Sequence, residues 1–156
     1  SESQFTEVSE GDSFAVGGID VTVVEVHDPD ATHPVGFLLQ YEGTTVFHGG
    51  DTKPHDGFAD LAEEYDIDLA VVAFGSVGTI PDKETGEAVE TKWYCDENQA
   101  VEIARTLEAT RMLPTHWDMW KGLTADPTAL HDHVRSFAFP KRLDVVEIGD
   151  RLDLSA

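Results

Sequence analysis

The sequence has little cysteine, few basic residues and no long apolar run. A single cysteine, Cys95, among 156 residues excludes an internal disulfide and a cysteine-rich zinc module. No apolar run reaches the roughly 18 residues of a membrane-spanning helix, and the opening SESQFTEVSE lacks the basic and apolar order of a signal peptide. We therefore expect a soluble, cytoplasmic protein that does not bind membranes, with residues 1–156 forming a single domain.

The shortage of basic residues gives the chain a strong negative charge. It has 31 Asp and Glu against 10 Lys and Arg, a formal net charge of -21. Because such a surface repels phosphate backbones, nucleic-acid binding is not expected. The acidic residues are spread along the chain, and high salt screens their mutual repulsion. We favour a halophilic, salt-adapted cytoplasm as the explanation over an acidic site for a basic partner.

The apolar pattern predicts alternating strands and helices, and hence an α/β fold with a mixed sheet and flanking helices. Residues 12–16 with 19–26, and 36–41 with 44–47, are expected to form hairpins, and the run 69–74 suits a buried strand. Helices are expected at 57–65, after a capping box of Asp96 and Gln99, and at 127–137. Short strands are predicted at 111–113 and 143–148, and residues 75–91 read as a long loop that borders a binding site.

The segment VFHGGDTKPHDG, residues 46–57, is unusually polar for a position directly after an apolar run. It could be a polar hairpin loop, a phosphate-binding glycine loop or a metal-binding turn. A P-loop is excluded because Lys53 is followed by proline, and the spacing of residues 74–78 does not fit a nucleophile elbow. For any one residue, a polar turn with a helix cap remains a sufficient explanation.

Three metal-capable side chains follow predicted strands directly or within a few residues: His27, Asp51 and His116. In an α/β sheet the ligand site lies beyond the carboxyl ends of the strands, so we expect these three to converge on one rim. Imidazole and carboxylate suit Zn²⁺, Fe²⁺ or Mn²⁺, and a carboxylate can bridge two ions. Gly49 and Gly50 allow a sharp bend before Asp51.

The remaining candidates each have a functional and a packing interpretation. His48 either faces a substrate or is hydrogen-bonded within the sheet, and His55 either lines the rim or caps the following helix. Trp117 either walls a substrate pocket or packs under the His116 loop, and Asp118 is a further candidate for substrate contact. Cys95, between two aromatic residues and a helix cap, is interpreted as a packing residue and not as a nucleophile.

The segments HGGDT (48–52), IDLA (67–70) and PTHWDMW (114–120) resemble the later motifs of the metallo-β-lactamase superfamily. Within it they most resemble the L-ascorbate-6-phosphate lactonases and related metal-dependent hydrolases. The resemblance implies a four-layer αββα sandwich with a dinuclear Zn²⁺ or Mn²⁺ site at one edge. It also implies that Asp51 bridges the ions, that His116 is the late histidine ligand, and that His27, with His33 as its competitor, is the ligand after the preceding strand.

The family's first metal motif, His-x-His-x-Asp-His, is absent, since no histidine precedes His27. We therefore expect the chain to be the C-terminal half of a hydrolase, inactive alone, whose complete form uses a metal-bound hydroxide on a small-molecule lactone, ester or phosphoester. Trp117 stands where lactonase-like members tend to carry a second histidine. The alternative is a non-catalytic half-domain that pairs with another copy or with a missing N-terminal half, because half a sandwich leaves apolar surface uncovered.

Overall fold

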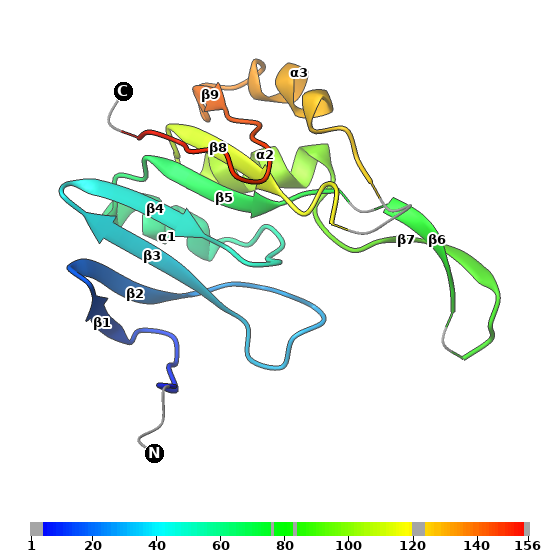
Figure 1. Ribbon diagram of the computed structural model, residues 1–156, viewed down its shortest axis with the longest axis horizontal. Coiled ribbons are helices and arrows are strands. Elements are labelled where there is room, and N and C mark those ends of the chain that lie inside the picture. The colour runs from blue at the N-terminus through cyan, green and yellow to red at the C-terminus, as the bar shows by residue number, and fades with distance from the viewer. Residues whose placement is uncertain (1–4, 76, 83, 120–123, 155–156) are drawn as a thin grey trace.

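The computed structural model describes residues 5–75, 77–82, 84–119 and 124–154, which form one mixed seven-stranded sheet, a separate two-stranded hairpin and flanking helices (Figure 1). This confirms the predicted α/β class. Within these residues no helix combines the length and apolar character needed to cross a membrane. The elements are β1 (Ser13–Val16), β2 (Ile19–Glu25), β3 (Val35–Tyr41), β4 (Thr44–His48), α1 (Gly57–Glu64), β5 (Leu69–Ala73), β6 (Val77–Pro81), β7 (Ala88–Lys92), α2 (Glu97–Thr106), β8 (Arg111–Thr115), a 3₁₀ turn (Pro127–Ala129), α3 (Leu130–Val134) and β9 (Arg142–Leu143).

The order of strands in the main sheet is β1-β2-β3-β4-β5-β8-β9. Neighbours from β1 to β4 pair antiparallel, whereas β4, β5, β8 and β9 pair parallel. Because β3 runs opposite to both β2 and β4, the strands β2, β4, β5 and β8 all point the same way. Their carboxyl ends therefore share one edge of the sheet, as the sequence argument requires.

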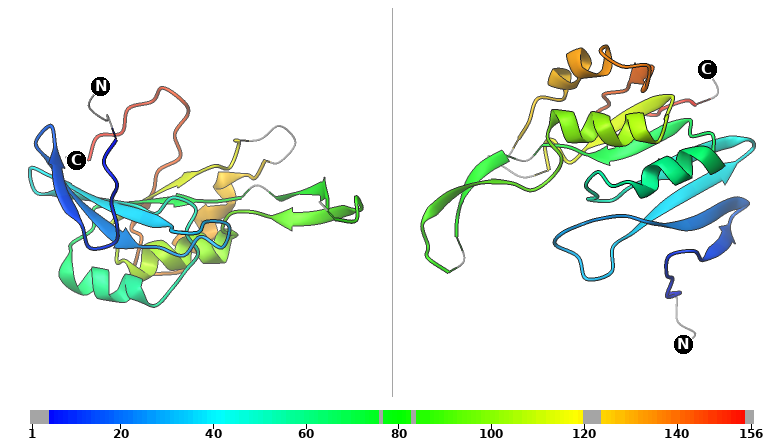
Figure 2. Two further views of the ribbon diagram at one scale, coloured as in Figure 1. Left: turned by 90° about the horizontal axis from the view of Figure 1, so that it is seen from below. Right: turned by 180° about the vertical axis from the view of Figure 1, so that it is seen from behind.

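One face of the sheet is packed against helices. Leu38, Phe47, Ala70 and Met112 are paired in register across β3, β4, β5 and β8, and all four are fully buried. They form one core with Phe58 of α1 and the apolar side of α2. Figure 2 shows α1 and α2 on this face and both terminal segments on the other.

The opposite face has apolar side chains that no helix covers. Phe37, Leu39, Val46 and Leu113 alternate with the buried row along β3, β4 and β8, and each is only half-buried. A sheet face of this kind is normally packed against a second layer. Among the described residues, only the terminal segments lie on this side.

The predicted loop at 75–91 is wrong, because it contains the hairpin β6–β7, which projects from the body (Figures 1 and 2). Its glycines and proline favoured a loop, whereas the Asp82 side chain closes a hairpin turn. Asp82 Oδ1 accepts backbone hydrogen bonds from Glu84 at 2.9 Å and Thr85 at 2.8 Å, and so closes the hairpin turn.

Two predictions near the C-terminus are also corrected. The strand predicted at 143–148 is reduced to Arg142–Leu143, because Asp144 turns inward to a buried ion pair with Arg111, 2.7 Å between Oδ2 and Nε. The helix predicted at 127–137 divides into a 3₁₀ turn, Pro127–Ala129, and the short helix α3.

The capping box of α2 is confirmed. Asp96 Oδ1 accepts a hydrogen bond from the Gln99 backbone at 3.0 Å, and Gln99 Oε1 accepts one from the Asp96 backbone at 3.2 Å. The bond from the Gln99 backbone lowers the pKa of the Asp96 carboxyl below its ordinary 3.8, so the cap is complete above that pH. The cap fixes where α2 begins, next to the carboxyl end of β5.

Asp96→Ala is expected to lower the free energy of unfolding by about 1 kcal/mol, because the first turn of α2 loses its acceptor. Asp96→Asn keeps a side-chain oxygen and serves as the matched control, with a smaller loss. Urea unfolding above pH 5 measures both. The difference between wild type and Asp96→Ala should shrink as the pH falls through the folded pKa of Asp96, and equal stability of the three proteins at pH 7 would contradict the assignment.

Candidate metal centre

Asp51 and His116 lie side by side at the carboxyl edge of the sheet. Asp51 is in the loop after β4 and His116 directly follows β8, and Asp51 Oδ1 is 3.0 Å from His116 Nδ1. The side chains are 39% and 27% exposed, so a ligand can reach them from solvent. Two of the three side chains expected on this rim are thus in contact.

The oxygen that Asp51 presents to His116 has an environment that suits a cation. Asp51 Oδ1 is itself covered, and it accepts no hydrogen bond within the part of the chain that the structure describes. A covered carboxylate oxygen without a hydrogen-bond donor carries a desolvation cost, which a bound cation reduces. An imidazole nitrogen and a carboxylate oxygen are ligands that Zn²⁺ and Mn²⁺ both accept, so the residues present fit a divalent metal ion.

The loop before Asp51 owes its shape to two glycines with different functions. Gly50 has a φ of +55°, in the left-handed region that favours glycine. Gly49 is required for packing: a Cβ there would lie 2.8 Å from the Thr52 methyl and 2.9 Å from the Phe47 ring. The space that Gly49 leaves is therefore filled by the protein itself.

His116 is held in a backbone conformation that is unusual for its residue type. Its φ is +68°, at the point where the chain leaves β8. Such positions cost of order 1–3 kcal/mol and are concentrated at functional sites. The Tyr94 ring packs against the imidazole with 4.6 Å between centroids, and its hydroxyl donates to Met119 Sδ at 3.7 Å. Tyr94 therefore restricts how the His116 ring can turn.

The ring of His27 lies in a different group. His27 Nε2 is 2.8 Å from Glu25 Oε1, and its ring stacks on His55 with 4.1 Å between centroids and 15° between planes. One potential ligand atom from each of Glu25, His27 and His55 lies within 4.8 Å of the others, so this group also could hold a metal ion. Its members are half-buried or exposed.

Two details decide how readily the Glu25 group can bind an ion. The two stacked imidazole planes are nearly parallel, so their in-plane lone pairs do not meet at one point without rotation of a ring. His55 Nδ1 accepts a hydrogen bond from the Gly57 backbone at 3.2 Å, which leaves the proton of the neutral ring on Nε2. Burial lowers the pKa of His55, and the hydrogen bond from His27 lowers the pKa of Glu25.

The backbone of His27 nevertheless lies against the Asp51 loop. His27 and Lys53 form an isolated antiparallel bridge, with the Lys53 N–H donating to the His27 carbonyl at 2.8 Å. The His27 N–H donates to Thr52 Oγ1 at 3.0 Å. The fold thus places the His27 main chain beside Asp51 and directs its ring toward Glu25.

The other predicted site residues have varied surroundings. His48 is exposed, and its Nδ1 accepts the Gly50 N–H at 3.2 Å. Trp117 packs against the edge of the hydrophobic core. Asp118 and His33 are exposed, His33 on the connection between β2 and β3. Their substrate or metal roles stay predictions.

Sequence reasoning did not select Glu25 or Tyr94. Glu25 could have been found, because residues two apart on a strand share a face and it precedes His27 by two. Tyr94 gave no such signal, because it is far from His116 in the sequence. The bridge that pairs Cys95 with Phe74 at the end of β5 brings its ring against His116.

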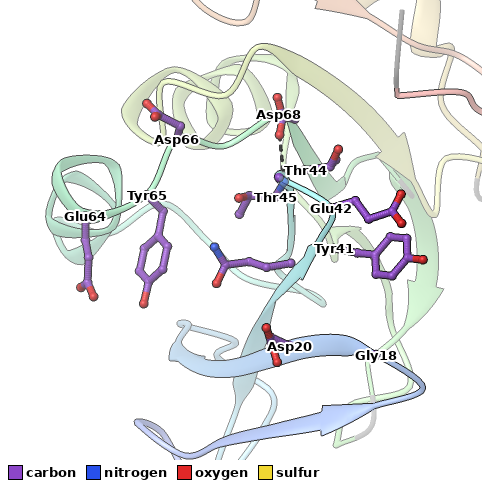
Figure 3. Close-up of a pocket in the computed structure, with 12 residues that line it drawn as sticks. Gly18, Asp20, Tyr41, Glu42, Thr44, Thr45, Glu64, Tyr65, Asp66 and Asp68 are labelled. Carbon is purple, nitrogen blue, oxygen red and sulfur yellow. Dashed lines mark hydrogen bonds between the residues drawn. The ribbon is translucent and has the colours of Figure 1, made fainter.

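A pocket of about 400 Å³ lies at the opposite edge of the sheet, near the start of β4 (Figure 3). Five carboxylates and no basic side chain line it, and one of them, Asp68, accepts the Thr45 N–H at 2.8 Å. The lining acids are Asp20, Glu42, Glu64, Asp66 and Asp68. It is remote from the strand ends that carry Asp51 and His116.

Cys95 is a buried packing residue, as expected. It is 1% exposed, its Sγ donates to the Thr52 carbonyl at 3.3 Å, and burial raises its pKa to about 11. A thiol of this kind is protonated at neutral pH and covered by its neighbours.

Several solved structures share this arrangement of strands and helices. Igni18, a novel metallo hydrolase from Ignicoccus hospitalis, superposes with a TM-score of 0.71 at 20% identity, over 93% of this chain and 58% of that one. The metallo-β-lactamase fold protein YhfI from Bacillus subtilis gives 0.59 at 16% identity, over 91% and 52%. These likenesses define the fold class.

Residues 1–117 match the family described as the beta-lactamase superfamily domain, and the chain belongs to this metallo-β-lactamase superfamily. It is 26% identical over 153 residues to a "UPF0173 metal-dependent hydrolase" of Pyrobaculum islandicum, and 26% identical over 161 residues to one of Myxococcus xanthus. The matches cover 97% and 95% of this chain but 61% and 52% of the relatives. The chain thus spans little more than half the length of these proteins.

Cys95 is expected to resist alkylation by iodoacetamide at pH 8 in the folded protein, because only about one thiol in a thousand is ionised at a pKa near 11 and the sulfur is covered. In urea the same thiol should react at the rate of a free cysteine. Mass spectrometry over time measures both rates. Rapid modification of the folded protein would show that Cys95 is an accessible nucleophile.

Proposed function

We propose that the full-length protein containing this chain is a metal-dependent hydrolase of a small-molecule lactone, ester or phosphoester. The observation that carries the proposal is the contact of Asp51 with His116 at the carboxyl edge of the sheet, with a covered carboxylate oxygen that has no hydrogen-bond donor among the described residues. The relatives named metal-dependent hydrolases support the same reaction class.

In this proposal Asp51 and His116 hold Zn²⁺ or Mn²⁺ in a site that becomes dinuclear in the complete protein. A divalent ion there supplies a Lewis acid and makes water a nucleophile at neutral pH. Asp51 offers an oxygen whose loop is fixed by Gly49 and Gly50. Tyr94 limits the rotation of the His116 ring, so that its nitrogen keeps facing Asp51.

His27 joins the centre by a rotation of its side chain. Its backbone is already fixed beside the Asp51 loop, whereas its side chain and that of its partner Glu25 are about half exposed, 54% and 52%. Exposed pairs of this kind contribute at most about 1 kcal/mol, so the rotation costs the weak Glu25 pair and the stacking of the ring on His55. His48, Trp117 and Asp118 surround the same edge and are the proposed substrate contacts; the lactonase branch is one choice of substrate within this proposal.

Asp51→Asn in the full-length protein is expected to abolish hydrolysis and to remove at least one equivalent of bound metal, because the amide oxygen is a far weaker ligand for a divalent ion. Asp132→Asn, the same change at an exposed position of α3, is the control. Elemental analysis and a lactone and ester substrate panel are the measurements. Normal metal content together with normal turnover in Asp51→Asn would refute the assignment.

A second candidate function is a non-catalytic unit that pairs through its open sheet face. The half-buried apolar side chains of Phe37, Leu39, Val46 and Leu113 favour it, since the terminal segments on this side leave them partly exposed. The partner is then another copy of the chain or the remainder of a longer protein.

The chain expressed alone is expected to self-associate and to bind an apolar dye through this open sheet face. Leu39→Lys should reduce both effects, whereas Val89→Lys on the projecting hairpin, also an exposed apolar position, should not. Sedimentation velocity and dye fluorescence measure them. A monodisperse monomer that binds no dye would exclude the pairing function.

A further inference from the structure

Thr52 lies where the His27 segment meets the Asp51 loop, and Cys95 packs against it. It is 1% exposed, although it follows the half-exposed Asp51 directly. Its hydroxyl accepts the His27 N–H at 3.0 Å and donates to the Lys53 carbonyl at 3.0 Å. A buried hydroxyl with both a donor and an acceptor is fixed in one orientation.

The backbone of Thr52 adds two further links. Its N–H donates to the Gly49 carbonyl at 3.2 Å, closing the turn that carries Asp51, and its carbonyl accepts from Cys95 Sγ at 3.3 Å. Cys95 is bridged to Phe74, whose N–H donates to the Thr115 carbonyl at 2.9 Å, one residue before His116. Thr52 therefore connects the His27 segment to the Asp51 loop directly, and reaches the His116 segment through Cys95 and Phe74.

The Thr52 methyl completes the arrangement. It occupies the space left open at Gly49, where a Cβ would approach it to 2.8 Å. The methyl group fixes the position of the turn, whereas the hydroxyl holds the backbone of His27, after the end of β2, against this turn. The two functions can be separated by substitution, since valine keeps the methyl group and replaces the hydroxyl, whereas serine keeps the hydroxyl and lacks the methyl group.

We propose that Thr52 is the positioning residue of the metal centre: its hydroxyl holds the main chain of His27 at a set distance from Asp51. The proposal rests on the proposed function. Thr52 touches neither substrate nor metal, and it acts through the two ligands that it connects. Residues that orient metal ligands in this way typically change metal affinity by about 10–100-fold when substituted.

The test compares three variants of the full-length protein in Zn²⁺ competition titrations and in the visible spectrum of the Co²⁺-loaded form. Thr52→Val is expected to weaken Zn²⁺ binding about 10–100-fold and to shift the Co²⁺ bands, because the His27 N–H loses its acceptor. Thr52→Ser should bind within about threefold of wild type. Thr45→Val is the matched control, a 6% exposed threonine at the other end of the same β4 segment, and should change neither readout.

Each result decides between the explanations. Wild-type affinity and spectrum in Thr52→Val overturn the positioning role, and so does equal damage by valine and serine, which would assign the effect to packing. If Thr52→Val fails to fold by circular dichroism, Thr52→Ser decides: a loss of more than tenfold overturns the proposal. If wild type itself binds no divalent ion, the proposed function fails first, and the positioning role falls with it.

Discussion

The parallel pairing of β4, β5 and β8 is the constraint on which the rest of the structure depends. Its register aligns Phe47, Ala70 and Met112 on the helix-covered face. A slip of one residue would turn this buried row toward the open face, so the register is strongly specified. The same register sets where β4 and β8 end, and hence brings Asp51 next to His116. Core packing and the position of the candidate site both follow from the parallel pairing of β4, β5 and β8.

Much of this fold could be predicted from local patterns. Short-range rules located the capping box of Asp96, the hairpins and the buried run of β5, because each depends on neighbours in the sequence. The hairpin β6–β7 was missed since its turn depends on the Asp82 side chain, and β9 was overextended because Asp144 is drawn inward by Arg111. That ion pair joins residues far apart in the sequence, so no local sequence pattern predicts it.

The edge of the sheet that carries the candidate site could be predicted, but which side chains contact one another there could be predicted only in part. Strand ends predicted the edge, and Asp51 and His116 are in contact there. His27 was expected on the same rim, and in the described residues its ring lies against Glu25, two residues earlier on the same strand face. Which of two neighbouring groups a histidine ring joins depends on side-chain rotation, and spacing in the sequence carries no information about that.

The net negative charge of the chain favours cations at its surface. Arg111 and Arg142 both bind Asp144, near the start of β8 and so away from the candidate centre. Lys53, two residues after Asp51, donates through Nζ to the Trp93 carbonyl at 3.0 Å. In a chain with 31 acidic and 10 basic residues, these contacts leave a negative potential over much of the surface, which concentrates divalent ions.

The two groups at the edge are not equivalent for such an ion. Glu25 and His27 are about half exposed, so water already solvates them and an ion gains little by replacing it. Asp51 Oδ1 is covered and receives no hydrogen bond among the described residues, so an ion there would relieve a desolvation penalty of about 1–3 kcal/mol. Asp51 and His116 are therefore the residues that would hold a first ion in the proposed centre, with the His27 main chain fixed beside them by Thr52.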